Sequence, residues 1–252
     1  MRPLIRYGLR LVGPALLLYL WQVAYDWNLL NRSLLPSPAD TALRLWQLIY
    51  TGDIGPDLAA TLVRMLAGFM SASVIGMVLG LVIGGVRPLY QALEFTIDFF
   101  RSLPVTTLYP LFVLFFGIGH ASKIAMVFVA SVFVVTLNSA YGVVNAGAVR
   151  TQMARLYGAT ATQRFRWITF YDALPQSLIG MRVALSYSLI VEIVAEMFMG
   201  SQVGLGQRVF EAYSRYAIDD LYAIILITGV MGYLLNRLFV LVERRLVDWG
   251  PR

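Results

Sequence analysis

The sequence predicts an all-α membrane protein with about six transmembrane helices, and three observations support this fold class. Apolar residues make up 59% of the 252 residues and charged residues only 13%, whereas a soluble domain carries about a quarter charged residues. The mean hydropathy is +0.71. Several apolar stretches also come close to, or exceed, the roughly 20 residues that cross a bilayer as a helix.

Six apolar segments are candidate spans. They are Leu11–Trp27, Leu62–Val86, Phe95–Phe116, Ile124–Val144, Leu178–Met199 and Leu221–Val242. The first follows three arginines, as the core of a signal peptide would. Trp21 and Trp27 stand where small residues would mark a cleavage site, so we expect a retained helix with an aromatic belt.

The spans divide the chain into four segments. We expect an N-terminal transmembrane helix at 1–28, a periplasmic segment at 29–60 with an interfacial helix at Ala39–Tyr50, a core of five spans at 61–245 and a tail at 246–252. Most arginines lie on the side that the two termini share with a polar loop at 145–177. Because positive charge favours the cytoplasmic side, we expect both termini and this loop in the cytoplasm.

Small residues form a stripe along the second span at four-residue intervals: Gly68, Ala72, Gly76, Gly80 and Gly84. Such a stripe allows close approach of another helix backbone, because lipid offers no hydrophobic drive for helix association. We expect packing within the chain, with a subunit interface as the alternative.

The third span is interrupted by Pro104 and Pro110. Broken helices at membrane depth are tolerated where they line a cavity or are buried in protein. Simple kinking is the alternative interpretation.

Composition excludes several kinds of chemistry. The chain has no cysteine and one histidine, His120, which excludes thiolate sites and most transition-metal and haem sites. Lys123 is the single lysine and no glycine-rich phosphate loop precedes it, so a P-loop is absent. The net charge of +6 comes from arginines that flank spans, which indicates topology and not nucleic-acid binding. His120 is expected in a solvated outer loop, with a partner contact as the alternative.

Ionisable residues within the spans need partners, because charge in a bilayer is costly. Glu192 and Glu196 lie one helical turn apart on the fifth span, and Asp98 and Arg101 are spaced to pair on the third. In one interpretation Arg101 pairs with Asp98 or with a glutamate and fixes helix positions. In the other, Arg101 lines a pathway and helps an anion cross. On the fourth span, Asn138 is expected to bond between helices.

The polar loop carries motifs of a known family. The family signature reads E-A-A, three residues, G, nine residues, I-x-L-P. Placing its glycine on Gly158 matches Ala154 and Ile168. The other two E-A-A positions, and the leucine and proline positions at Phe170 and Tyr171, depart from it. A Leu174-Pro175 pair follows. Further matches are Arg101-Ser102-Leu103-Pro104, the run from Pro110 to Lys123, Ala195-Glu196-Met197 with Gly204-Leu205-Gly206, and Gly180-Met181-Arg182.

Over residues 35–245 the chain resembles the permease subunits of ABC importers, in the group that serves nitrate, sulfonate, taurine and bicarbonate. The resemblance implies the type I ABC importer permease fold, a homodimer in the bacterial inner membrane, a cytoplasmic ATPase subunit that binds ATP and Mg, and a periplasmic or lipid-anchored solute-binding protein. No cofactor is expected on this chain. The implied ATPase-docking residues of the coupling loop are Ala154, Gly158, Ala159, Thr160, Gln163, Arg164, Ile168 and Pro175.

The loop itself suits docking, because Gly158 permits a sharp turn and Gln163 and Arg164 could bond an acidic edge of the partner. We also expect Pro175 to start the next helix. The competing hypothesis is a self-sufficient channel or ion-coupled secondary transporter that uses Glu192 and Glu196. A membrane enzyme is the more distant alternative.

Overall fold

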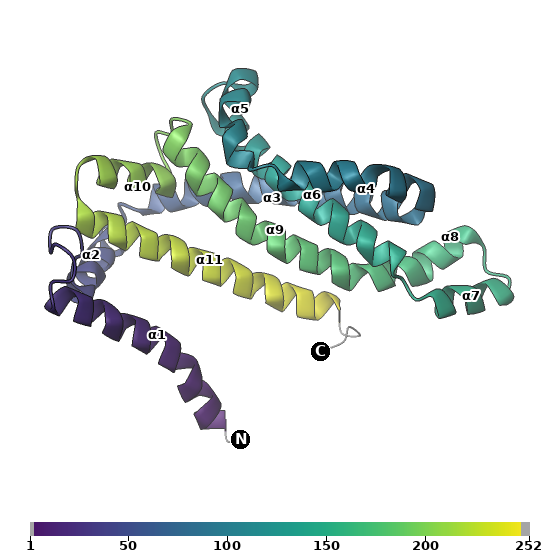
Figure 1. The fold of residues 1–252 in the computed structure, drawn as a ribbon, viewed down its shortest axis with the longest axis horizontal. Helices are drawn as coiled ribbons and strands as arrows, with labels where there is room; N and C mark the ends of the chain where they lie inside the picture. The colour runs from purple at the N-terminus through teal and green to yellow at the C-terminus, as the bar shows by residue number, and fades with distance from the viewer. Residues whose placement is uncertain (1–2, 248–252) are drawn as a thin grey trace.

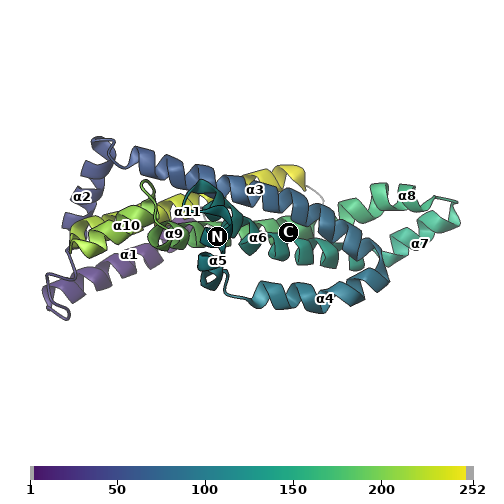
Figure 2. The same cartoon turned by 90° about the horizontal axis from the view of Figure 1, so that it is seen from above.

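The computed structural model describes residues 3–247, and within this range the regular structure is helical. The elements are α1 (Pro3–Asp26), α2 (Pro38–Tyr50), α3 (Gly55–Gly85), α4 (Arg87–Ser102), η1 (Val105–Leu108), α5 (Tyr109–Phe116), α6 (His120–Val144), α7 (Ala148–Leu156), α8 (Ala161–Arg164), η2 (Phe165–Thr169), α9 (Phe170–Phe198), α10 (Leu205–Ser214) and α11 (Ile218–Leu246). Figures 1 and 2 show an elongated bundle with α2 and α10 at one end and α7 and α8 at the other.

Four helices are long and apolar enough to cross a membrane: α3, α6, the continuous helix Ala161–Phe198 and α11. A fifth candidate is the bent pair Arg87–Ser102 and Val105–Phe116. The predicted first span is helical in α1, but it is not among these candidates in the described part of the chain.

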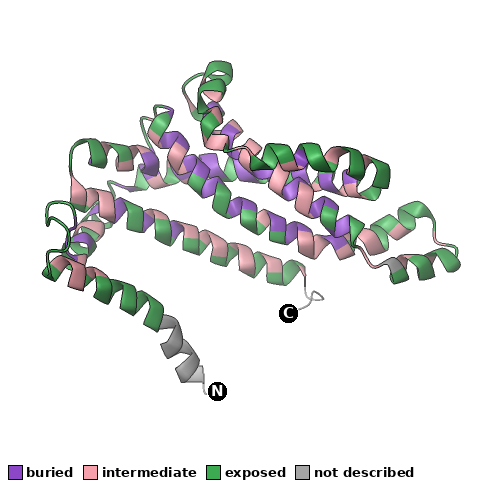
Figure 3. Ribbon diagram, in the orientation of Figure 1, coloured by how far each residue is buried: buried purple, intermediate pink, exposed green. Residues whose placement is uncertain are grey.

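The centre of the bundle is formed by α3, α6 and α9, whose facing sides are buried (Figure 3). The small-residue stripe of α3 packs on α6 of the same chain. A Cβ atom added at Gly68 would lie 2.8 Å from the Ile124 carbonyl oxygen, and one at Gly84 would lie 2.6 Å from that of Ala140. The expectation of packing within the chain is therefore confirmed.

The third predicted span is not one helix. It begins in α4 at Arg87, bends by 78° and continues through η1 into α5. The bend lies at Leu103 and Pro104, where extended backbone separates the helices. Pro110 lies in the first turn of α5, where proline costs no helical hydrogen bond, so it helps to start a helix and does not interrupt one.

Helix boundaries around the polar loop differ from those predicted. The loop 145–177 contains α7, α8 and the π-helical turn η2, and α9 already begins at Phe170. The prediction that Pro175 starts this helix is wrong, because Pro175 lies inside α9. The interfacial helix is present as α2, but α3 begins at Gly55, before the expected boundary at 61. Most of the predicted tail at 246–252 lies outside the described residues.

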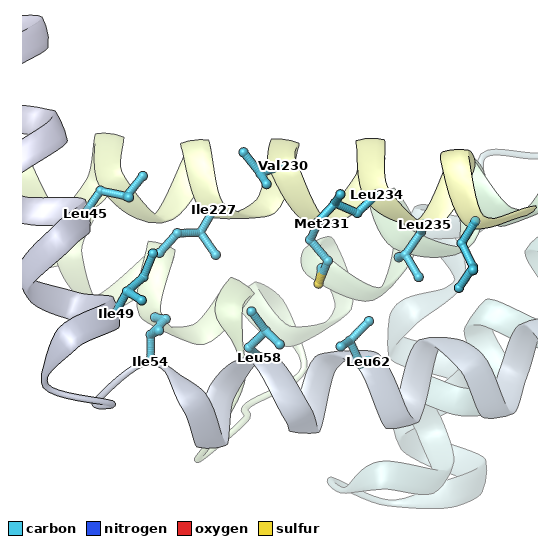
Figure 4. A pocket seen from close by; sticks show the side chains of 11 residues that line it. Leu45, Ile49, Ile54, Leu58, Leu62, Ile227, Val230, Met231, Leu234 and Leu235 are labelled. Carbon is cyan, nitrogen blue, oxygen red and sulfur yellow. The ribbon is translucent and has the colours of Figure 1, made fainter.

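A groove of about 370 Å³ lies between α2, α3 and α11 (Figure 4). Aliphatic side chains and Met231 line it, from Leu45 and Ile49 at one end to Leu235 and Leu238 at the other. No polar side chain is among the lining residues, so the groove has no group that would orient a polar solute.

Candidate functional sites at the two ends of the bundle

The first candidate site is the hairpin, which we define as α7, α8 and the turn between them (residues 148–164). It projects from one end of the bundle (Figure 1). Leu156 and Tyr157 at its tip are 86% and 92% exposed. Gly158 follows with φ +80°, a conformation that glycine adopts without steric cost. The tip therefore offers large apolar side chains at a tight turn.

Three of the predicted docking residues bond within the turn of the hairpin. Thr160 and Gln163 form a capping box at the start of α8: Thr160 N donates to Gln163 Oε1 at 2.8 Å and Gln163 N donates to Thr160 Oγ1 at 3.3 Å. Arg164 Nη1 donates to the Ala159 carbonyl at 2.9 Å. These bonds thus stabilise the turn from within the chain. That Gln163 and Arg164 also bond an acidic edge of a partner stays a prediction.

A hollow of about 450 Å³ lies on the hairpin. Its lining consists of Ala154, Tyr157, Gly158, Ala159, Gln163, Arg164, Trp167 and Ile168. Thr160 lies in the turn beside it, whereas Pro175 belongs to α9 and does not line it. Most of the predicted docking residues are therefore brought together.

One ion pair fastens the hairpin to the bundle. Arg150 Nη2 lies 2.7 Å from Asp172 Oδ1, and Gly147 N donates to Asp172 Oδ2 at 3.1 Å. At the other side, α8 continues through η2 into α9. Sequence reasoning missed Asp172, which no motif marks. A force on the hairpin would therefore reach α9 through both connections.

The second candidate site is the buried ion cluster, which we define as Arg64, Glu192 and Glu196. Both glutamates are 0% exposed and Arg64 is 3% exposed. Arg64 Nη1 lies 2.6 Å from Glu196 Oε1 and 3.5 Å from Glu192 Oε1. Buried charges are stable only when paired and hydrogen-bonded. Arg64 on α3 is therefore the counter-ion of the two glutamates on α9.

Further hydrogen bonds complete the environment of Glu196. Thr61 Oγ1 donates to Glu196 Oε1 at 2.8 Å, and Gly206 N donates to Glu196 Oε2 at 2.8 Å. Arg64 in turn donates through Nη2 to the Val203 carbonyl at 2.7 Å and through Nε to His120 Nδ1 at 2.9 Å. The cluster therefore ties α3, α6, α9 and the start of α10 together at the end opposite the hairpin.

The intramembrane pairing is only partly as predicted. Arg101 pairs with Asp98 at 3.0 Å on α4, and both side chains are about half exposed. Neither glutamate pairs with Arg101; their partner is Arg64, which the sequence analysis did not single out. An arginine within an apolar span was the available signal, because such a charge requires a counter-ion.

Two other expectations can be placed. His120 is exposed, as expected, and it also accepts the bond from Arg64. Asn138 accepts a hydrogen bond from Gln176 Nε2 at 3.1 Å, between α6 and α9, which confirms an interhelical role. Near the ion cluster, Asp57 binds Gly204 N at 2.7 Å and Arg208 Nε at 2.6 Å.

Comparison with known proteins decides the family. Residues 72–248 match the family described as "binding-protein-dependent transport system inner membrane component". This chain belongs to that family. The permease is accordingly an inner-membrane component of a binding-protein-dependent transport system, and the resemblance inferred from the motifs is confirmed.

Two relatives align along nearly the whole permease. The taurine transport system permease protein TauC of Escherichia coli (strain K12) is 28% identical over 253 residues, covering 98% of this chain and 92% of TauC. The nitrate import permease protein NrtB of Synechocystis sp. (strain ATCC 27184 / PCC 6803 / Kazusa) is 26% identical over 245 residues, covering 94% and 88%.

A chain of the MetNI methionine ABC transporter, solved in inward-facing conformations, has a similar structure. It superposes with a TM-score of 0.65 at 20% identity, covering 75% of this chain and 93% of that chain. This likeness confirms the predicted ABC importer permease fold.

Proposed function

We propose that two copies of this permease form the pathway of an ATP-driven importer for a small anion, and that each copy seats one ATPase subunit on its hairpin. The observation that carries the proposal is the exposed hairpin tip, joined without interruption to a membrane-spanning helix. Large apolar side chains exposed around a polar hollow are typical of a protein–protein contact.

The hairpin is built to pass on motion. Its α8 end continues into α9, which has 29 residues and therefore spans roughly 44 Å at about 1.5 Å per residue. The far end of α9 carries the buried ion cluster. ATP and Mg bind to the ATPase subunits, whose closure moves the hairpins together. The helices then rock as rigid bodies and expose the pathway to alternate sides.

The proposed orientation places both termini and the hairpin in the cytoplasm. The arginine-rich ends of the spans support this through the positive-inside rule. A periplasmic or lipid-anchored solute-binding protein then delivers solute to the opposite end, at segments 29–60 and 200–220. The relatives named for taurine and nitrate support a small anionic solute, because taurine has a sulfonate group and nitrate is itself an oxyanion.

The ion-coupled alternative is not supported by the geometry at Glu196. A carboxylate that carries a cation through the membrane must be able to release its counter-ion. Glu196 instead accepts hydrogen bonds from Arg64, Thr61 and Gly206. This arrangement fits a brace between helices.

Co-purification with the ATPase subunit tests the docking role of the hairpin. We expect Gly158→Trp to abolish it, because a large side chain at the turn blocks the seat. The matched control is Gly52→Trp: Gly52 lies at the opposite end with φ +72°, and like Gly158 it has no heavy atom within 4 Å of an added Cβ. Equal co-purification of both variants would contradict the proposal. So would solute uptake by this chain alone, driven by an ion gradient.

A further inference from the structure

A cavity of about 480 Å³ with both polar and apolar lining lies beside the buried ion cluster, at the end opposite the hairpin. Three segments enclose it: the third turn of α3, the start of α6 and the turn between α9 and α10. The lining residues that carry the argument are Arg64, His120 and Lys123. We propose that this cavity is a binding site for a small oxyanion, such as nitrate or a sulfonate, within the permease itself.

The first argument is the asymmetry of charge around the cavity. Arg64 and Lys123 both line it and are 3% and 2% exposed. Glu192 and Glu196 balance these charges but are not among the lining residues. The four side chains are therefore formally neutral together, yet the cavity wall carries only the positive members. An anion that enters meets both cations at close range and the carboxylates only behind Arg64.

The second argument is the incomplete pairing of Lys123. Its ammonium donates to the Gly119 carbonyl at 3.1 Å and to the Gly200 carbonyl at 3.4 Å. In the described part of the chain it has no ion-paired carboxylate. An ammonium has three donors, so one N–H is left over. A buried ammonium with no carboxylate in direct contact is costly, and an anion in the cavity would give it that contact.

The third argument is the set of donors. Because His120 Nδ1 accepts from Arg64, its proton lies on Nε2, which makes Nε2–H a donor. Arg64 Nη2 uses one of its two protons on the Val203 carbonyl. Donors from α3 and α6 thus surround one cavity, which suits several oxygens of one anion better than a single point charge.

The carboxylates behind Arg64 give the site a transport role. A pathway site must attract its ion and also release it. Glu192 and Glu196 reduce the positive potential of Arg64 and so keep binding weak. This role rests on the proposed function, which assigns the cavity to the side where solute arrives. The binding itself does not depend on it.

The test measures anion binding to the purified full-length permease without ATPase or binding protein. Nitrate and ethanesulfonate are titrated against chloride at constant ionic strength, and thermal stabilisation is recorded, because a ligand that binds the folded state raises its stability. We expect stabilisation of the wild type by both probes, at least tenfold weaker apparent affinity in Lys123→Gln, and recovery in Lys123→Arg. Arg237→Gln, at an exposed residue of α11 that does not line the cavity, is the matched control and should behave as wild type.

Lys123→Gln is expected to fold, because it removes no ion pair and its amide can still donate to a carbonyl. Absence of stabilisation in the wild type would overturn the inference, as would equal stabilisation of Lys123→Gln. Either result would leave the hairpin proposal intact if ATPase co-purification is retained. Conversely, if the co-purification test contradicted the hairpin proposal, a measured anion site that depends on Lys123 would still stand.

Discussion

Replacing Arg64 by methionine tests whether the buried ion cluster holds the bundle together. The change keeps much of the side-chain volume but removes the guanidinium that lies 2.6 Å from Glu196 and 3.5 Å from Glu192. It also removes the bonds to the Val203 carbonyl and to His120. Two carboxylates with 0% exposure then remain without their counter-ion.

The magnitude follows from burial. Removing one partner of a buried ion pair costs about 3–5 kcal/mol, because the other charge is left uncompensated. For a chain of this length, 1 kcal/mol shifts the unfolding temperature by about 2–4 °C, so we expect Arg64→Met to unfold roughly 6–20 °C lower. The matched control is Arg101→Met, whose partner Asp98 is about half exposed. An exposed pair contributes about 1 kcal/mol or less, so this variant should stay within a few degrees of wild type.

Thermal unfolding of the purified protein in detergent provides the measurement, and a double variant isolates the charge. Glu196→Gln should restore part of the stability in the Arg64→Met background, because glutamine removes a buried negative charge. Its amide oxygen, in the place of Oε2, can still accept from Gly206 N and from Thr61 Oγ1, which lies 3.0 Å from Oε2. If Arg64→Met does not accumulate, the yield of the double variant gives the same comparison. Similar unfolding temperatures for Arg64→Met and Arg101→Met would refute the reasoning.

Three further predictions concern packing and the hairpin. Gly80→Ala should destabilise the protein by about 1–3 kcal/mol, because its Cβ would meet the Thr136 carbonyl and Ser139 of α6. The control Gly229→Ala has open space around its Cβ and should be neutral in the same unfolding assay. Equal effects of the two substitutions would contradict the close α3–α6 contact. Thr160→Ala should lower the stability of the hairpin by about 1 kcal/mol, because it removes the capping box. Amide hydrogen exchange should become faster in α8 and stay unchanged in α10. Unchanged exchange in α8 would rule out this cap. Asp172→Ala removes the bonds to Gly147 N and Arg150 and should increase proteolysis of the hairpin while the unfolding temperature changes little. Unchanged proteolysis would show that the continuous α8–α9 connection alone holds the hairpin.

Much of the architecture could be predicted because it depends on local sequence. Apolar length marks four of the spans and the bent fifth. The spacing of Gly68, Gly76 and Gly84 predicts the face that packs, since residues four apart share a side of a helix. The helix α2 and the motif-bearing loop could also be predicted, because they too depend on local sequence. Boundaries were less accurate, because η2 and the early start of α9 continue a helix through a stretch that mixes aromatic residues with Arg166 and Asp172, where hydropathy marks no boundary.

What the sequence determined, then, is which segments are helical, which face of each is small or apolar, and that the family's inner-loop motif stands between two spans. The pairing of the buried charges was decided by tertiary structure alone. Glu192 has a neighbour in sequence at Glu196, but the counter-ion of both is Arg64, 128 and 132 positions away. A buried charge selects its partner by distance in space and by the exclusion of water. Neither quantity is defined until α3 and α9 are packed together.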